Sequence, residues 1–325
     1  MSSSKSKKLK YRVLFVDDEP RVTSALKAIF RREYDVAIAN SGQEALDLLS
    51  ETKFDVLVSD QRMPGMLGHE LLAIVAKKYP HTMRILLTGF MDKQAIVDSL
   101  NDGEIYRFIN KPWHNDEMRE VVAEAALASE LPVPSFDAAK TTDKRIADNS
   151  GSSTANTHSA MLMMEHASDV RTQIRRFCTD HSIMVYGTQN IQQAVAAATS
   201  RDNIGVAVIE LSKDIKASLQ TIHLLKLARP EVITIALTEE YDTNTAVNLI
   251  NQGQVFKYLA KPLDINGFQQ TIEKAFHRHH FLKRHKKSRQ RYRVEKPKGN
   301  LIAGLQDMFK RLRHGEDTQD KRHHH

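Results

Sequence analysis

The feature that most constrains how this chain can fold is an internal repetition at an offset of about 150 residues. Short apolar runs, each long enough for one buried strand, end on chemically similar residues in the two halves of the sequence. Asp60 and Glu210 form one such pair, and Thr88 and Thr238 form another, both at an offset of 150. A repetition carried by several elements in the same order predicts a tandem duplication, with two domains of one architecture.

Apolar runs alternate with stretches of helical periodicity through the first half. The predicted strands are residues 11–16, 34–39, 54–59, 84–87 and 105–109. One predicted helix begins after residue 20, and four more cover residues 42–49, 69–79, 93–100 and 117–128. Five strands alternating with five helices predict a doubly wound α/β domain with a parallel sheet. Matching runs at 160–164, 205–209, 232–237 and 255–259 predict the same fold again, which places the two domains at residues 11–128 and 159–280.

The segments outside these domains are polar. Residues 1–10 form a basic leader, and residues 129–158 carry Pro, Gly, Ser, Thr and Asn without an apolar period, which predicts a flexible linker. No apolar stretch approaches the roughly 20 residues that a membrane-spanning helix needs. Cys178 is the single cysteine, which excludes an internal disulfide and favours a cytoplasmic protein.

The last segment, residues 281–325, is a basic tail. Residues 277–298 hold ten Lys or Arg and a single acid, and residues 301–314 have the apolar period of an amphipathic helix. The terminal histidines, 323–325, are interpreted as the remnant of a tag. Several roles remain open for this tail: contact with a protein, self-association, binding to an anionic membrane, binding to nucleic acid, or no specific role. It has few aromatic residues for base stacking and no recognised DNA-reading motif.

Five polar side chains follow the predicted strands of the first half. They are Asp17, Asp18, Asp60, Thr88 and Lys111. If strand 1 is central and strands 3 and 4 lie beside it, these groups converge at the carboxyl edge of the sheet. Three carboxylates packed together require a cation, and oxygen ligands suit Mg²⁺. A hydroxyl and an ammonium group at the rim suit phosphoryl oxygens, so the set predicts phosphoryl transfer.

Four motifs carry a resemblance to a known family. They are Val16-Asp17-Asp18-Glu19-Pro20, Ser59-Asp60-Gln61-Arg62-Met63-Pro64-Gly65, Leu87-Thr88-Gly89 and Phe108-Ile109-Asn110-Lys111-Pro112. Together they resemble the receiver domain of two-component response regulators, and the resemblance covers residues 11–128. It implies that Asp60 accepts a phosphoryl group from a histidine kinase or a histidine phosphotransfer protein.

The resemblance also assigns a role to each site residue. The implied Mg²⁺ ligands are Asp17, Asp18, Asp60 and the backbone carbonyl of Arg62. Lys111 is expected to pair with one phosphoryl oxygen and Thr88 to hydrogen-bond another. The Lys111-Pro112 peptide bond is expected to be cis, which proline makes inexpensive.

Phosphorylation is expected to switch the domain between two states. Negative charge on Asp60 would draw Thr88 inward and leave space into which Phe108 rotates, so that the face formed by helix 4, strand 5 and helix 5 changes shape. The alternative is that Phe108 is a permanently buried core residue.

The second repeat departs from this pattern where the chemistry would occur. Glu165 and His166 stand in place of the two metal-binding aspartates, and Glu210 replaces Asp60, while Thr238 and Lys261 remain. We therefore expect Mg²⁺ in the first receiver only and interpret residues 159–280 as a degenerate pseudo-receiver. Either Glu210 keeps this domain in an active-like state, or the site has lost its chemistry and the fold persists as a binding surface.

These observations lead to one functional hypothesis and one alternative. The hypothesis is a response regulator without a catalytic output domain, acting through phosphorylation-dependent contact with a protein partner that the sequence does not identify. A homodimer is one form that such contact can take. The alternative is a nucleic-acid-binding regulator that acts through the basic tail.

Overall fold

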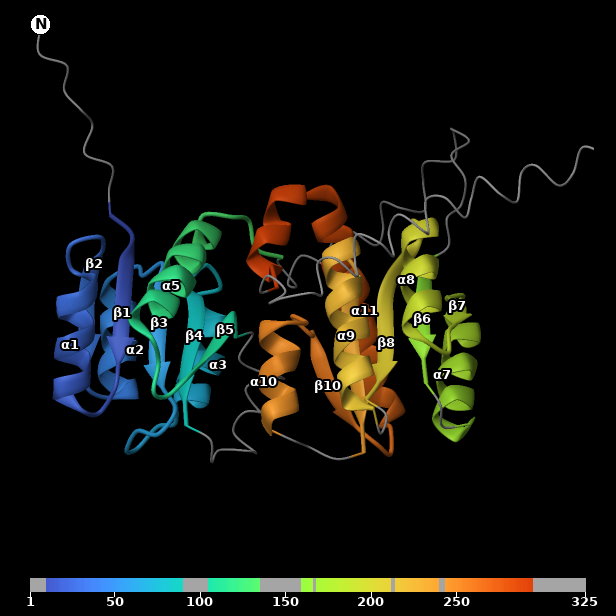
Figure 1. Ribbon diagram of the computed structural model, residues 1–325, viewed down its shortest axis with the longest axis horizontal. Coiled ribbons are helices and arrows are strands. Elements are labelled where there is room, and N and C mark those ends of the chain that lie inside the picture. Colours follow the sequence, from blue (N-terminus) through green and yellow to red (C-terminus); the bar gives the residue numbers. More distant parts are fainter. Residues whose placement is uncertain are drawn as a thin grey trace, which may run out of the picture.

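Two five-stranded parallel sheets stand next to one another in the molecule (Figure 1). The computed structural model describes residues 10–89, 105–134, 159–165, 168–211, 214–239 and 243–294. We call the first sheet with its helices the first unit and the second sheet with its helices the second unit. Among the described helices, none has the length and apolar character that a membrane span requires.

The first sheet is built from the strands predicted for the first half. They are β1 (Arg12–Val16), β2 (Asp35–Ala39), β3 (Val56–Asp60), β4 (Met83–Thr88) and β5 (Arg107–Asn110), in the spatial order β2-β1-β3-β4-β5. All pairings are parallel. Every residue of β3 and β4 is buried, which explains the continuous apolar runs in their sequences.

One prediction about this sheet was wrong. The central strand is β3, which pairs with β1 on one side and β4 on the other, so β1 and β4 are not neighbours. All interior strands of a parallel sheet are buried on both faces, and their apolar pattern therefore does not distinguish the first strand from the third. The groups after β1, β3 and β4 nevertheless reach the same edge of the sheet.

The described helices of the first unit are α1 (Pro20–Phe30), α2 (Gly42–Glu51), α3 (Gly68–Lys78) and α5 (Asn115–Ser129). Proline in the first turn of α1 has a backbone angle that suits the start of a helix. Ser41 caps α2 by accepting a hydrogen bond from the backbone N–H of Glu44 at 3.1 Å. The helix predicted at residues 93–100 lies outside the described residues.

The second sheet repeats the strand order of the first. Its strands are β6 (Ala160–Met164), β7 (Met184–Gly187), β8 (Ile204–Glu210), β9 (Ile233–Thr238) and β10 (Lys257–Ala260), in the order β10-β9-β8-β6-β7. Numbered within its own half, each sheet follows 2-1-3-4-5. The helices are α7 (Ser168–Asp180), α8 (Ile191–Ser200), α9 (Ile215–Ala228), α10 (Thr243–Asn251) and α11 (Ile265–Arg284).

The two units meet along the edge strand β5, which faces α10 of the second unit (Figure 1). A 3-10 helix, η1 (Lys286–Tyr292), follows α11 and lies at the top of this junction, beside α5. Residues 281–294 of the predicted tail therefore belong to the folded structure, with Arg291 and Val294 buried. The helix predicted at residues 301–314 lies outside the described residues, as do residues 135–158 of the linker and residues 1–9 of the leader.

Candidate functional site

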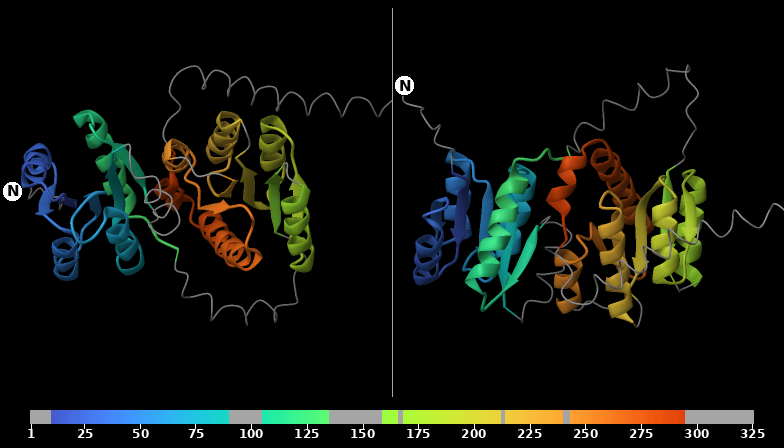
Figure 2. Two further views of the ribbon diagram at one scale, coloured as in Figure 1. Left: turned by 90° about the horizontal axis from the view of Figure 1, so that it is seen from below. Right: turned by 45° about the horizontal axis from the view of Figure 1, so that its top comes forward.

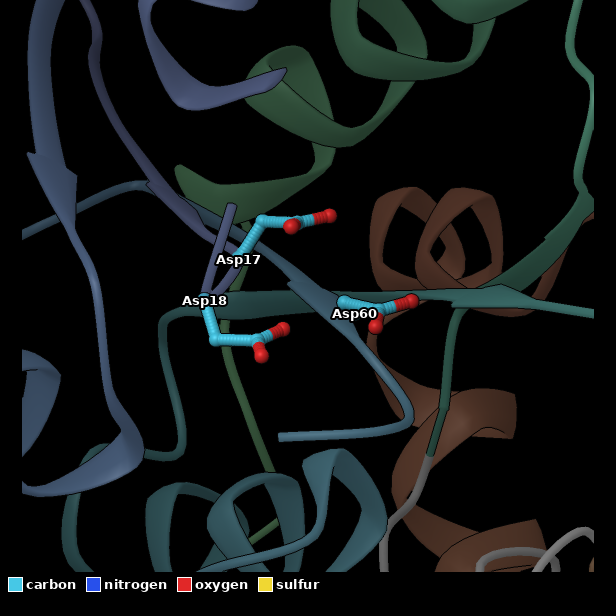
Figure 3. Close-up of side chains that lie close together, drawn as sticks. All are labelled: Asp17, Asp18 and Asp60. Carbon is cyan, nitrogen blue, oxygen red and sulfur yellow. The ribbon is translucent and has the colours of Figure 1, made fainter. Parts of the chain in front are cut away.

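Three carboxylates gather at the carboxyl edge of the first sheet (Figure 3). Asp17, Asp18 and Asp60 each offer a carboxylate oxygen within 4.8 Å of the others. The aspartates come together because β1 and β3 are adjacent and both end at this edge. Asp17 and Asp60 are buried, with exposed fractions of 1% and 7%, whereas Asp18 is partly exposed. The three predicted aspartates therefore form one cluster.

Backbone groups hold the two buried carboxylates in place. Asp60 accepts a hydrogen bond from the backbone N–H of Arg62 at 3.1 Å, and Asp17 accepts one from the backbone N–H of Glu19 at 2.9 Å. These bonds use one oxygen of each carboxylate, and the oxygens that face the cluster are hard donors of the kind that Mg²⁺ prefers. The partly exposed Asp18 leaves one side open to solvent. The residues present therefore fit a Mg²⁺ ion that keeps several of its waters.

Lys111 joins the cluster from the loop after β5. Its Nζ lies 2.7 Å from Asp60 Oδ1 and 3.1 Å from Asp17 Oδ2. Burial lowers the pKa of Lys111, but hydrogen bonds to Asp60 and Asp17 outweigh burial and raise this pKa above its usual value. The Lys111-Pro112 peptide bond is cis, as predicted.

The two residues assigned to the switch are both buried. Thr88 is 1% exposed, and its hydroxyl donates to the carbonyl oxygen of Gly89 at 3.1 Å. Phe108 is 4% exposed and belongs to an apolar cluster that contains residues of both units. Rotation of Phe108 remains a prediction about a second state.

Three residues near Asp60 were not predicted to matter. Gln61 Oε1 accepts from the backbone N–H of His69 at 3.1 Å, and Gln61 Nε2 lies 2.8 Å from His69 Nδ1. Gly68 lies so close to Asp60 that a Cβ there would be 2.1 Å from the Asp60 carbonyl oxygen. A glycine at the start of a helix, just beyond the Pro-Gly turn, was the available signal for this close approach.

The corresponding place in the second unit holds an ion-pair cluster. Lys261 Nζ lies 2.9 Å from Glu165 Oε1 and forms an even closer contact with Glu210 Oε1. Burial lowers the pKa of Lys261, but hydrogen bonds to Glu210 and Glu165 raise it overall. Thr238 is 4% exposed, at the end of the adjacent β9, and the Lys261-Pro262 bond is also cis. His166 lies outside the described residues.

Comparison with known proteins places the first unit in a family. The sequence pattern of the response regulator receiver domain matches residues 13–123. Residues 13–123 form a response regulator receiver domain. This confirms the resemblance for residues 13–123 and agrees with the five-stranded parallel sheet and the aspartate cluster.

Curated relatives of the receiver domain are regulatory proteins. The hydrogenase transcriptional regulatory protein HoxA of Cupriavidus necator is 38% identical over 119 residues, which are 37% of this chain and 25% of HoxA. The response regulator protein FleR of Pseudomonas aeruginosa is 30% identical over 122 residues, 37% of this chain and 25% of FleR. The chain thus spans about a quarter of the length of these relatives.

A solved receiver structure also matches this region. The signal receiver domain of an HD domain-containing protein from Pseudomonas fluorescens Pf-5 is 33% identical, covering 37% of this chain and 97% of that chain, with a TM-score of 0.36.

Proposed function

We propose that this protein is a response regulator in which Asp60 accepts a phosphoryl group from a histidine kinase or a histidine phosphotransfer protein. The observation that carries the proposal is the convergence of Asp17, Asp18 and Lys111 on the carboxylate of Asp60. Three carboxylates with oxygens within 4.8 Å of one another repel, and the single positive charge of Lys111 leaves an excess of negative charge that a divalent cation would neutralise.

The chain's own residues account for each part of the transfer. A carboxylate oxygen of Asp60 forms a bond to phosphorus as the donor's P–N bond breaks, and the electron pair of that bond stays on the donor histidine. Lys111 pairs with a phosphoryl oxygen, and the Thr88 hydroxyl hydrogen-bonds another. Mg²⁺, held by Asp17, Asp18, Asp60 and the Arg62 carbonyl, would neutralise charge between the carboxylate and the incoming phosphoryl group.

The second unit, residues 159–280, is proposed to be a degenerate receiver that is not phosphorylated. Its strand order and its Lys261 support common ancestry with the first unit. Glu210 occupies the position of the acceptor but is bonded to Lys261, and Glu165 is bonded to the same ammonium group. Lys261, the group that would pair with a phosphoryl oxygen, has a side chain that is 8% exposed, against 29% for Lys111, and is therefore less open to an incoming anion.

Output is proposed to occur through phosphorylation-dependent protein contact. Two parallel α/β units occupy most of the described residues, which leaves little of the described chain for a separate catalytic domain. In this proposal Asp60 receives the phosphoryl group, and the surfaces around β5 contact the protein partner.

Labelling with acetyl phosphate and Mg²⁺ tests this function. The wild-type chain should become labelled and Asp60→Ala should not, while Glu210→Ala, the matched variant of the second unit, should label like wild type. Label that persists in Asp60→Ala would show that the acceptor is a different residue.

Nucleic-acid binding remains the alternative because relatives such as HoxA are named as transcriptional regulatory proteins. Lys283, Lys286 and Lys287 are exposed and would support contact with phosphates. Binding of duplex DNA that falls steeply with salt and disappears when Lys283, Lys286 and Lys287 are replaced by Gln would favour this output. No binding at low salt would exclude it.

A further inference from the structure

Polar side chains of the second unit occupy the open edge of the receiver's sheet. Asn251, the last residue of α10, accepts a hydrogen bond from the backbone N–H of Phe108 at 2.9 Å and donates one to the Phe108 carbonyl oxygen at 3.0 Å. Gln254 Nε2 donates to the carbonyl oxygen of Tyr106 at 2.8 Å. An edge strand leaves such backbone groups unpaired. The two side-chain amides therefore supply the hydrogen bonds that a neighbouring strand would make with β5.

Apolar packing and backbone geometry reinforce this contact. Ile105 and Phe108 of the receiver belong to the same cluster of buried residues as Ile250 and Val255 of the second unit. Gln254 has a positive φ of 44°, which is uncommon for a residue other than glycine and persists only where surrounding contacts favour it. Here that backbone conformation accompanies the bond from Gln254 to β5.

The helix η1 connects the two units a second time. Arg291 is only 5% exposed. Its guanidinium donates hydrogen bonds to three backbone carbonyl oxygens of the receiver, those of Pro80 (2.9 Å), Ala128 (2.9 Å) and Leu131 (3.2 Å). Arg289, two residues earlier, pairs with Glu231 of the second unit at 3.2 Å. Figure 2 shows this segment lying between α5 and α11 in its tilted view. We call the bonds of Asn251, Gln254 and Arg291 to the receiver the interdomain contact.

The interdomain contact and the phosphorylation site are connected by β5 and the loop that follows it. Phe108, held by Asn251, is three residues before Lys111, which bonds Asp60 and Asp17. Phosphorylation adds a charge of roughly −1.5 to −2 to Asp60 and three acceptor oxygens. The new group changes what Lys111 contacts, and Lys111 directly follows Asn110, the last residue of β5.

We propose that the β5 edge is the surface through which phosphorylation of Asp60 controls binding of the chain's own second unit. The interdomain contact forms with β5 in the position that this strand has while Lys111 bonds Asp60 and Asp17. Phosphorylation weakens this contact. The proposal rests on the proposed function of Asp60 as phosphoryl acceptor. Because coupling between two sites is reciprocal, loss of the contact also favours phosphorylation.

Hydrogen exchange at the Phe108 amide measures the contact directly in the full chain. Its N–H is bonded to the second unit, whereas the neighbouring N–H groups of Tyr106 and Lys111 donate within the receiver, to Arg84 and Thr88. Acetyl phosphate with Mg²⁺ should speed exchange at Phe108 at least about fivefold, the lower end of usual allosteric couplings. The Asp60→Ala chain should show no change, and intact mass should report the phosphoryl group in parallel.

A pair of variants on α10 tests the reciprocal effect. Asn251→Ala removes both bonds to Phe108, so exchange there should be fast without phosphodonor, and Asp60 should be labelled several-fold more completely at equilibrium. Asn248→Ala is the matched control, because the bonds of Asn248 to Gln252 stay within the second unit. It should behave like wild type.

The outcomes separate the two proposals. A phosphoryl group on Asp60 with unchanged or slower exchange at Phe108 would overturn the coupling and leave the proposed function intact. Absence of a phosphoryl group on Asp60 would overturn both. Equal labelling of Asn251→Ala and Asn248→Ala would contradict the reciprocal coupling.

Discussion

The two lysine-centred sites of this chain differ in how their charges are balanced. Lys111 faces a cluster of three aspartates, one of them partly exposed, and its own side chain is 29% exposed. Lys261 faces two glutamates, and its side chain is 8% exposed. The first site carries the larger excess of negative charge and lies beside solvent, whereas the second is nearly closed.

This difference has a chemical consequence. An excess of carboxylates next to water can take up a divalent cation and then an anionic phosphoryl group. Lys261 has fewer carboxylates around it to hold a cation, and its side chain is too little exposed to meet an incoming anion. The site around Lys261 is thus a buried ion-pair cluster, and removal of one partner from such a cluster is costly to stability.

Removing the metal should have the largest effect. Asp18→Ala, or chelation of Mg²⁺, should slow labelling of Asp60 by about 100-fold or more, because a bound cation supplies several kcal/mol of charge stabilisation. Initial rates with acetyl phosphate measure this. His166→Ala, at the matching position of the second repeat, should leave the rate unchanged, and a similar loss in both variants would contradict the assignment of Mg²⁺ to the first unit.

Replacement of each lysine by alanine should lower the free energy of unfolding by different amounts at the two sites. Lys261→Ala leaves the buried carboxylates of Glu165 and Glu210 facing each other and should cost about 3 to 5 kcal/mol of unfolding free energy. Lys111→Ala should cost less when Mg²⁺ is present, because the cation replaces the lost positive charge. Urea unfolding followed by hydrogen exchange in each unit measures both values. Equal losses would mean that the second site is no more closed than the first.

The second unit should also be the more sensitive of the two to acid. Burial lowers the pKa of His279 from 6.5 to about 4 in the folded state, where its ring lies 2.9 Å from the Glu231 carbonyl oxygen. The unfolded chain therefore binds a proton at a higher pH than the folded chain. Stability that is complete above pH 6.5 is lost as the pH falls toward 4, by about 3 kcal/mol in total.

Equilibrium unfolding of the second unit between pH 7 and pH 4 measures this loss. His279→Gln should flatten the pH dependence, whatever its effect at pH 7, and His285→Gln, an exposed histidine just beyond α11, should not. An unchanged slope in His279→Gln would assign the acid sensitivity to another group.

The sequence was informative wherever a strand ends at the sheet edge. Asp17, Asp18, Asp60 and Lys111 could be placed together because parallel strands deliver their carboxyl ends to one edge. The spatial order of the strands could not be predicted from the sequence, because β1 and β3 are equally apolar.

The role of the basic segment was also hidden. A run of Lys and Arg is typical of a solvated surface, but Arg291 donates to backbone carbonyl oxygens, which every sequence possesses and no side-chain pattern reveals. The same reason conceals the bonds of Asn251 to β5. Contacts between side chains and backbone leave almost no signature in a single sequence.

The most direct test of the contrast between the two sites is the position of the acyl phosphate. The chain should be labelled with acetyl phosphate and Mg²⁺, reduced with borohydride to fix the modified carboxylate, and mapped by peptide mass spectrometry, both as wild type and as Glu210→Asp. We predict modification of Asp60 alone in both chains, because a shorter acceptor does not supply the missing metal ligands. Modification at residue 210 in either chain, or an unmodified Asp60, would contradict the account.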